Sequence, residues 1–327
     1  MPSVSHLFID KLTVVYNGIN TNSGFTEYMR SLQNARRFEI RWRGINYLNR
    51  GYRYAWHISL LGVRGPASIL ILAEPFRSIE ASFLSVEWNP NKLGYEGQQV
   101  FWQVMREILI DDFDPFIFQA IITRIDLSID IYPLTVDAIL VSARRMRFSD
   151  HRCGNHGLLE SLRLGSRHSA LSFLIYQRRP ADSRRVSHNP FTTRLEATIK
   201  PRITLHELHS THLPNPFSRL LIVNNVNPVE LSGTSYQYKW LLDSARLRAL
   251  QSALLLIDSD RTRNKYRRWL IQNLQTDWFN ADAIWREYDS AISVLGLQAY
   301  FGLNILRMAH INDGTFHIQR HRRIARD

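Results

Sequence analysis

In the stretch from residue 123 to residue 131, TRIDLSIDI, polar and apolar side chains alternate strictly from Arg124 onward. Because side chains of a β-strand point alternately to the two faces of a sheet, this alternation predicts a half-buried strand. We expect its apolar side to pack on a core, and its polar side carries Arg124, Asp126, Ser128 and Asp130. Side chains four residues apart lie roughly 13 Å apart along a strand, so these two carboxylates can bind one ion only with help from a neighbouring strand.

A second stretch, residues 193–200, has the same pattern, with Arg194, Glu196, Thr198 and Lys200 on one face. If the two strands are neighbours, Asp126 and Glu196 converge with an arginine beside each. The alternative is a pair of amphipathic strands whose polar faces meet solvent, which is the more common outcome for any single strand of this kind.

The rest of the chain predicts an α+β fold with a largely antiparallel sheet, because strands and helices are mixed without strict alternation. Strand patterns cover residues 8–16, 38–42, 52–61, 68–72, 83–88, 158–164 and 171–176. Helical patterns cover residues 26–37, 97–109 and 136–146, and later 236–256, 261–274 and 282–295. We therefore expect a sheet domain over residues 1–215 and a helical C-terminal domain over residues 216–327.

The charge balance favours an acidic partner. The chain has 327 residues, and its 41 Lys and Arg against 29 Asp and Glu give a net charge of +12. This indicates nucleic acid first and an anionic membrane surface second. Cys153 is the only cysteine, which excludes a disulfide framework and fits a reducing cytoplasm. No secretion signal is evident, and the longest uncharged run, residues 290–306, is shorter than the ~20 apolar residues that cross a bilayer.

Four short motifs occur in order: TRIDLSID at 123–130, LGSRHS at 164–169, IYQRR at 175–179 and TRLE at 193–196. Each motif alone is weak, but their order and spacing resemble the replication initiation factors of rolling-circle plasmids and filamentous phages. The resemblance covers roughly residues 80 to 205. It implies a DNA nickase and strand transferase that acts on a plasmid or phage origin in the bacterial cytoplasm.

The resemblance also implies roles for single residues. Tyr176 would be the nucleophile, which forms a 5′-phosphotyrosine and releases a 3′-hydroxyl. A tyrosine with a reference pKa near 10 needs a metal, cations or a base to attack a phosphodiester. The hard ions Mg²⁺ or Mn²⁺ would be held by carboxylates, and the phosphate would be held by arginines. The expected metal ligands are Asp126, Asp130 and Glu196, and the expected phosphate contacts are Arg124, Arg178, Arg179 and Arg194.

The sequence departs from the family pattern after the tyrosine. Relatives usually have Asp-Lys or Asn-Lys there, whereas this chain has Gln177 and Arg178. Arg178 keeps the cation but cannot carry a proton, so a proton-carrying role would belong to another group. The His-hydrophobe-His metal motif of the better-known nickases is absent from the sequence, which favours carboxylate ligands. A non-catalytic DNA-binding protein, either a repressor or a decayed initiator, remains the alternative, with a theta-type initiator that only melts DNA as a weaker third.

Further DNA contacts are expected outside these motifs. Arg167 lies at the tip of the hairpin predicted between residues 158 and 176, and Arg263 and Arg267 lie on the basic helix 261–274. The expected DNA partners are the double-stranded origin and the single-stranded nick site, with a host helicase and a second copy of the chain as further partners. His206, His209 and His212 are spaced by three, but Pro214 and their polar setting favour a solvated linker over a metal site.

Overall fold

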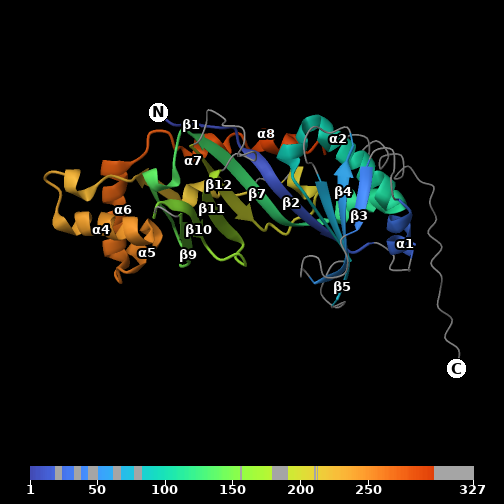
Figure 1. The fold of residues 1–327 in the computed structure, drawn as a ribbon, viewed down its shortest axis with the longest axis horizontal. Helices are drawn as coiled ribbons and strands as arrows, with labels where there is room; N and C mark the ends of the chain where they lie inside the picture. Colours follow the sequence, from blue (N-terminus) through green and yellow to red (C-terminus); the bar gives the residue numbers. More distant parts are fainter. Residues whose placement is uncertain are drawn as a thin grey trace, which may run out of the picture.

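The structure is a computed structural model built around one large antiparallel sheet (Figure 1). It describes residues 1–18, 24–32, 38–42, 51–61, 68–76, 83–154, 157–178, 191–209, 211 and 213–297. The strand order is β3-β4-β5-β6-β2-β7-β12-β11-β10-β9, and β1 also pairs with β7. The strands are β1 (Ser3–Val4), β2 (Phe8–Tyr16), β3 (Phe38–Trp42), β4 (Tyr52–Leu60), β5 (Ser68–Pro75), β6 (Leu84–Trp88), β7 (Ile121–Tyr132), β9 (Ser149–Cys153), β10 (Leu159–Leu164), β11 (Leu171–Arg178) and β12 (Thr192–Ile199). The predicted α+β class with a largely antiparallel sheet is confirmed.

The apolar face of the sheet carries the main core. Ile125, Leu127, Ile129 and Ile131 of β7 are fully buried, as their alternation predicts. They share this core with the helices α2 (Pro90–Leu109) and α3 (Phe113–Gln119), and a short helix, η1 (Ile110–Asp112), joins the two. The side chain of Asn89 caps the start of α2 by accepting from the Lys92 amide at 2.9 Å. α1 (Gly24–Ser31) adds Met29 to the same core.

A second, smaller core lies at one end of the sheet. The helices α4 (Tyr236–Arg248), α5 (Leu250–Leu255) and α6 (Asp260–Leu274) pack on a two-stranded sheet of β8 (Ile139–Ala143) and β13 (Leu220–Asn224). We call residues 236–274 the helical unit. Figure 1 shows it beside β9 and β10, while α1 and α2 lie at the opposite end of the molecule. Three short helices precede the helical unit along the chain: η3 (Glu207–His209), η4 (Phe217–Arg219) and η5 (Pro228–Glu230). Leu208 of η3 and Phe217 of η4 belong to the main core.

The last described helices return to the main core. Ile284 of α7 (Ala281–Trp285) and Tyr288 and Ile292 of α8 (Tyr288–Ser293) are buried against the large sheet. Beyond α8, the Leu295 carbonyl accepts a hydrogen bond from Trp102 Nε1 at 2.6 Å. The residues after 215 therefore contribute to two cores. In the part of the chain that the structure describes, no helix combines the length and the apolar character that a bilayer span requires.

One predicted element is wrong. Residues 136–146, expected to be a helix, form the short helix η2 (Val136–Ala138) followed by strand β8. All five residues of β8 are buried, and the strand pairs with β13, whose segment the sequence pattern did not predict as a strand. A short apolar run satisfies a helical and a buried-strand pattern equally well, so the distant partner decided between them.

Candidate functional site

The antiparallel register brings the two polar strands side by side. Arg194 of β12 lies opposite Asp130 of β7, and Thr198 lies opposite Asp126. Glu196 lies opposite Ser128 and is therefore diagonal to both aspartates. On the far side of β12, Tyr176 of β11 lies opposite Arg194. The prediction that the strands 123–131 and 193–200 are neighbours is confirmed, and the cross-strand pairing places Tyr176 on the same face.

Strand β2 closes the other side of this polar face and adds two charged residues. Its pairing with β7 shifts register between Ile9 and Lys11, and Lys11 lies opposite Asp126. A bulge of this kind locally breaks the alternation of faces. Asp10 thereby reaches Arg194 Nη1 at 3.0 Å and also accepts from Asn89 Nδ2 at 3.2 Å. The sequence analysis did not predict Asp10 as a site residue. The signal that could have found it is the pair of adjacent charged residues, Asp10 and Lys11, inside an otherwise apolar strand.

Two aspartates on this face are held by arginines. Arg124 Nε donates to both carboxylate oxygens of Asp126 at 2.9 and 3.0 Å, and its Nη2 adds a contact of 2.6 Å. Thr198 donates to the same carboxylate at 2.8 Å. Asp130 accepts from Arg194 Nε at 2.7 Å and Nη2 at 3.0 Å, and from Arg178 Nη1 at 2.7 Å. Bidentate pairs of this kind fix both partners, so the arginines are held in place before any ligand arrives.

Among the described residues, Glu196 has no such bidentate partner. Burial, together with the carboxylates of Asp126 and Asp10, raises the pKa of Glu196 to about 7. The positive charges of Arg124 and Lys11 offset this rise only in part, because the Arg124 guanidinium lies 3.8 Å from Glu196 and is engaged by Asp126. A carboxyl group with this pKa can gain or lose a proton near neutral pH, as a general base must.

Tyr176 is half-buried on β11. Burial raises the pKa of its phenol above the ordinary value, and the positive charge of Arg194 acts in the opposite direction. The negative charges of Glu196 and Asp10 add to the rise. Tyr176 is therefore a neutral phenol at neutral pH, and it would need a proton acceptor to become a nucleophile.

The expected metal ligands fit a metal ion only in part. Within the described ranges, no group of three or more His, Cys, Asp or Glu side chains is arranged to hold a metal. Asp130 fits poorly, because its carboxylate is bound by two arginines, Arg178 and Arg194. Asp126 is bound by one arginine, Arg124, and lies close enough to Glu196 to raise the pKa of that carboxyl. These two carboxylates could hold Mg²⁺ or Mn²⁺, since such ions are commonly held by one or two carboxylates plus substrate phosphates. A cation there would compete with Arg124 for Asp126.

The remaining predicted contacts lie at the edge of this face or far from it. Arg167 is exposed in the β10–β11 turn, and its carbonyl accepts from Lys200 Nζ at 2.6 Å. Arg163 of β10, which sequence reasoning missed, is half-buried, and burial together with the charges of Arg167 and Arg124 lowers its pKa. Arg263 and Arg267 lie on α6 in the helical unit. Arg179 lies outside the described residues, as does His212, while His206 is exposed.

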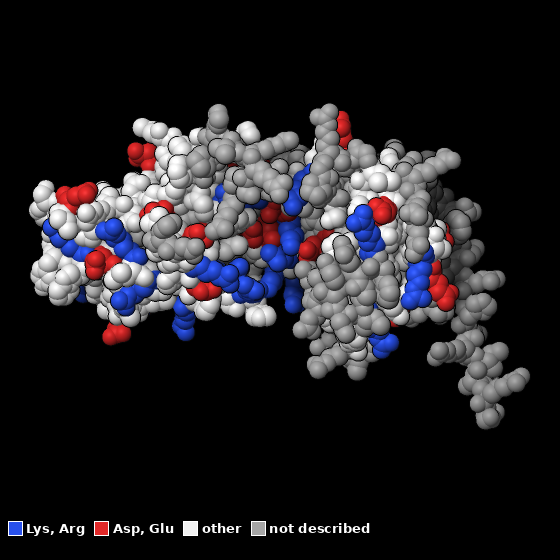
Figure 2. Space-filling view, viewed as in Figure 1, with Lys and Arg blue, Asp and Glu red and all other residues white. Residues whose placement is uncertain are grey.

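The charges of this face are visible from outside. Figure 2 shows acidic side chains gathered near the middle of the molecule, over the strands of the polar face, with Lys and Arg side chains beside them and over the helical unit.

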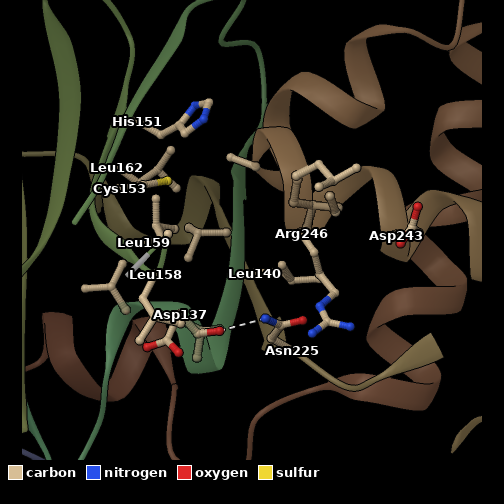
Figure 3. A pocket seen from close by; sticks show the side chains of 18 residues that line it. Asp137, Leu140, His151, Cys153, Leu158, Leu159, Leu162, Asn225, Asp243 and Arg246 are labelled. Carbon is tan, nitrogen blue, oxygen red and sulfur yellow. Dashed lines mark hydrogen bonds between the residues drawn. The ribbon is translucent and has the colours of Figure 1, made fainter. Parts of the chain in front are cut away.

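A separate cavity of about 320 Å³ lies between β8, β10 and α4 (Figure 3). Asp137, His151 and Arg246 line it, and Asn225 Nδ2 donates to the Asp137 carbonyl at 2.7 Å. None of the predicted site residues lines this cavity.

Comparison with known proteins gives little beyond this geometry. No protein-family model and no curated protein matches the sequence. Among solved structures, the chain is similar to a rolling circle replication initiator protein from Geobacillus stearothermophilus. The TM-score is 0.37 and the identity 12%, over 82% of this chain and 97% of that chain. A TM-score this low supports no inference about the site.

Proposed function

We propose that the chain is a rolling-circle replication initiator, a DNA nickase and strand transferase with Tyr176 as its nucleophile. The observation that carries the proposal is the meeting of Tyr176, Arg194 and Glu196 on one face of neighbouring strands. A phenol, fixed cations and a carboxyl group that titrates near neutrality are the groups that attack on a phosphodiester requires.

In the proposed step, Tyr176 Oη attacks the phosphorus and forms a 5′-phosphotyrosine. The bond between phosphorus and the 3′ oxygen breaks, and that oxygen takes a proton from water and leaves as a 3′-hydroxyl. Glu196, diagonal to Tyr176 across β11 and β12, is the candidate acceptor for the phenolic proton. It takes the place of the lysine that Arg178 replaces, since an arginine keeps its proton.

Arg178 and Arg194 would hold the phosphate. Arg178 is exposed, and Arg194 is buried. Asp130 binds both, so we assign it as a positioning residue that aims the two guanidinium groups. If Asp126 and Glu196 held Mg²⁺ or Mn²⁺, the cation would stabilise the extra negative charge of the phosphoryl oxygens. Glu196 would then be a ligand in place of the base, because a bound cation favours the carboxylate, and the phenolic proton would pass to water.

One observation favours the alternative, a non-catalytic DNA-binding protein. The pairs of Arg124 with Asp126 and of Arg194 with Asp130 satisfy each other without a ligand. A closed polar network of this kind can serve only to hold strands in register. In that case Tyr176 and Glu196 would have no chemical role.

The test is incubation of the pure protein with supercoiled plasmid that carries the replicon encoding it, with Mg²⁺ or with EDTA. Relaxation together with a covalent protein–DNA adduct, mapped by mass spectrometry to the peptide of Tyr176, is the expected result. Tight binding to the same plasmid without relaxation or adduct would instead establish the non-catalytic alternative. An adduct on a different tyrosine would refute the assignment of the nucleophile.

A further inference from the structure

A large groove lies between α6 and the turn that joins β8 to β9. Its volume is about 1140 Å³. Its charged lining consists of Arg144, Arg145, Arg147, Arg263, Arg267, Arg268 and a single acid, Asp260. These arginines come from two segments more than 100 residues apart in the sequence, so the groove is a product of the fold.

The geometry of both segments explains why the arginines converge. Arg145 adopts a positive φ of 62°, so the chain reverses directly after β8. On α6, Arg263 and Arg267 are four residues apart and therefore share a face. The core of the helical unit includes Leu140 of β8, and this contact brings α6 against the turn.

The arginines of this groove outnumber the acceptors around them. In the described part of the chain, the Nε atoms of Arg263 and Arg267 are buried and have no hydrogen-bond partner. Asp260, the one acidic residue that lines the groove, accepts from Arg263 Nη2 at 2.6 Å, and Arg267 and Arg268 donate only to Asn264, at 3.5 Å, among the described residues. Burial and the charges of Arg263 and Arg144 lower the pKa of Arg267. Six arginines against one acid leave the groove strongly positive, and an anion with several oxygens would balance that charge through charge-assisted hydrogen bonds.

The groove lies beside the strands that lead to the candidate active face. The amide of Gly165, at the start of the β10–β11 turn, donates to the Phe148 carbonyl at 2.8 Å, so this turn lies against the segment that follows Arg147. Arg167 at its tip and Arg163 on β10 then lead towards Arg124. A chain of cations of this length fits a polymer with regularly spaced phosphates better than a single small anion.

We propose that the groove between α6 and the residues 144–147 binds the phosphate backbone of duplex DNA, and that the Arg167 turn leads from it to Tyr176. The proposal rests on the proposed function for its ligand, DNA, but the binding does not require nicking. The polar side chains that line the groove are arginines, apart from Asn264 and Asp260. We therefore expect contacts with phosphates, which do not depend on the DNA sequence, to dominate.

The test compares three double variants of the full chain. Arg145→Gln/Arg267→Gln removes two charges from the groove, and Arg145→Lys/Arg267→Lys keeps them. Arg41→Gln/Arg53→Gln removes two exposed charges from β3 and β4, at the other end of the sheet. Binding to a fluorescein-labelled duplex of about two helical turns is measured by anisotropy over a range of salt concentrations, and melting curves check that each variant is folded.

The glutamine variant of the groove is expected to bind about tenfold more weakly and to lose about two units of the log–log salt slope, since each lost phosphate contact removes about one unit. The lysine and β-sheet variants should keep the wild-type slope. An unchanged slope in the folded glutamine variant would overturn the proposal. The same titration with labelled polyglutamate tests for an acidic protein partner. If the glutamine variant lost binding to polyglutamate but kept its DNA binding, the proposal would be overturned in favour of such a partner. If the wild-type protein bound duplex DNA through this groove but never nicked it, the proposed function would be refuted and the groove proposal would stand.

Discussion

Arg194 lies directly opposite Asp130 across β12 and β7, and its guanidinium donates to both carboxylate oxygens at 2.7 and 3.0 Å. The same guanidinium lies over the ring of Phe8 at 4.9 Å and reaches Asp10 at 3.0 Å. Arg194 is thus held by three partners and has one cross-strand neighbour, Tyr176, on its remaining side. In the proposed site, Asp130 would therefore act through Arg194 and Arg178, and Asp126 and Glu196 would be the metal ligands.

Tyr176→Phe is expected to abolish nicking and to leave duplex binding within about twofold of wild type. Only the nucleophilic oxygen is lost, and the ring keeps its packing on β11. The measurement is plasmid relaxation together with anisotropy titration. Tyr132→Phe, at another half-buried tyrosine at the end of β7, is the control and should nick normally. Residual adduct formation in Tyr176→Phe would contradict the assignment.

Asp126→Asn and Glu196→Gln are each expected to weaken Mn²⁺ binding at least tenfold, because an amide keeps the shape but loses the charge that a hard cation requires. Calorimetric titration with Mn²⁺ measures this. Asp130→Asn is the matched control on the same strand and should keep wild-type Mn²⁺ affinity, although nicking should slow as Arg178 and Arg194 lose their anchor. If all three variants bound Mn²⁺ with wild-type affinity, the proposed metal site would be ruled out.

The pKa of Glu196, raised from 4.5 to about 7, has a consequence for stability. Between these pH values the folded protein holds a proton that the unfolded chain has released. The contribution of this group to the free energy of unfolding is therefore present below about pH 4.5 and is lost as pH rises through 7. At about 1.4 kcal/mol per pH unit, the loss amounts to at most about 3 kcal/mol.

Glu196→Gln removes this loss, so the variant should gain stability relative to wild type as pH rises from about 5 to about 8. Urea denaturation of both proteins at the two pH values gives the difference. Adding Mn²⁺ should flatten the fall in the wild type, because a bound cation favours the carboxylate. A stability difference that is independent of pH would show that the Glu196 pKa is not raised.

Tyr288→Ala is expected to lower the free energy of unfolding by about 3–5 kcal/mol, as removal of a large buried aromatic side chain does. Tyr288 is 2% exposed in the main core and stacks on Trp285 with ring centroids 4.5 Å apart. Tyr95→Ala, at a 66% exposed tyrosine on α2, is the control and should change stability by less than about 1 kcal/mol. Equal effects would show that α8 is not part of the main core.

The packing of α8 on the main core changes what a truncation would do. The sequence predicts a domain boundary near residue 215, so a chain that ends near residue 230 would be expected to keep nicking and to lose selection of the duplex origin. In the structure, such a chain loses Ile284, Tyr288, Ile292 and Leu295 from the main core. We therefore expect it to be destabilised as a whole, and point variants of α6 are the proper way to separate the two activities.

The sequence by itself determined the local features of this protein. Strict alternation at residues 123–131 and 193–200 identified two strands and the face on which each polar residue lies, because the side-chain period of a strand depends only on the chain itself. The motif order also suggested Tyr176. The strand boundaries of β2, β3, β4, β6 and β10 and the extent of α6 followed from the same local patterns.

Only the tertiary structure decided which segments meet. The pairing of β8 with β13 turned an expected helix into a strand, and a bulge in β2 brought Asp10 to Arg194. The basic groove required α6 to pack beside the turn at residues 144–147, and α8 returned to the main core past the helical unit. These outcomes depend on cross-strand register and on burial between distant segments, and neither leaves a periodic signal in the sequence.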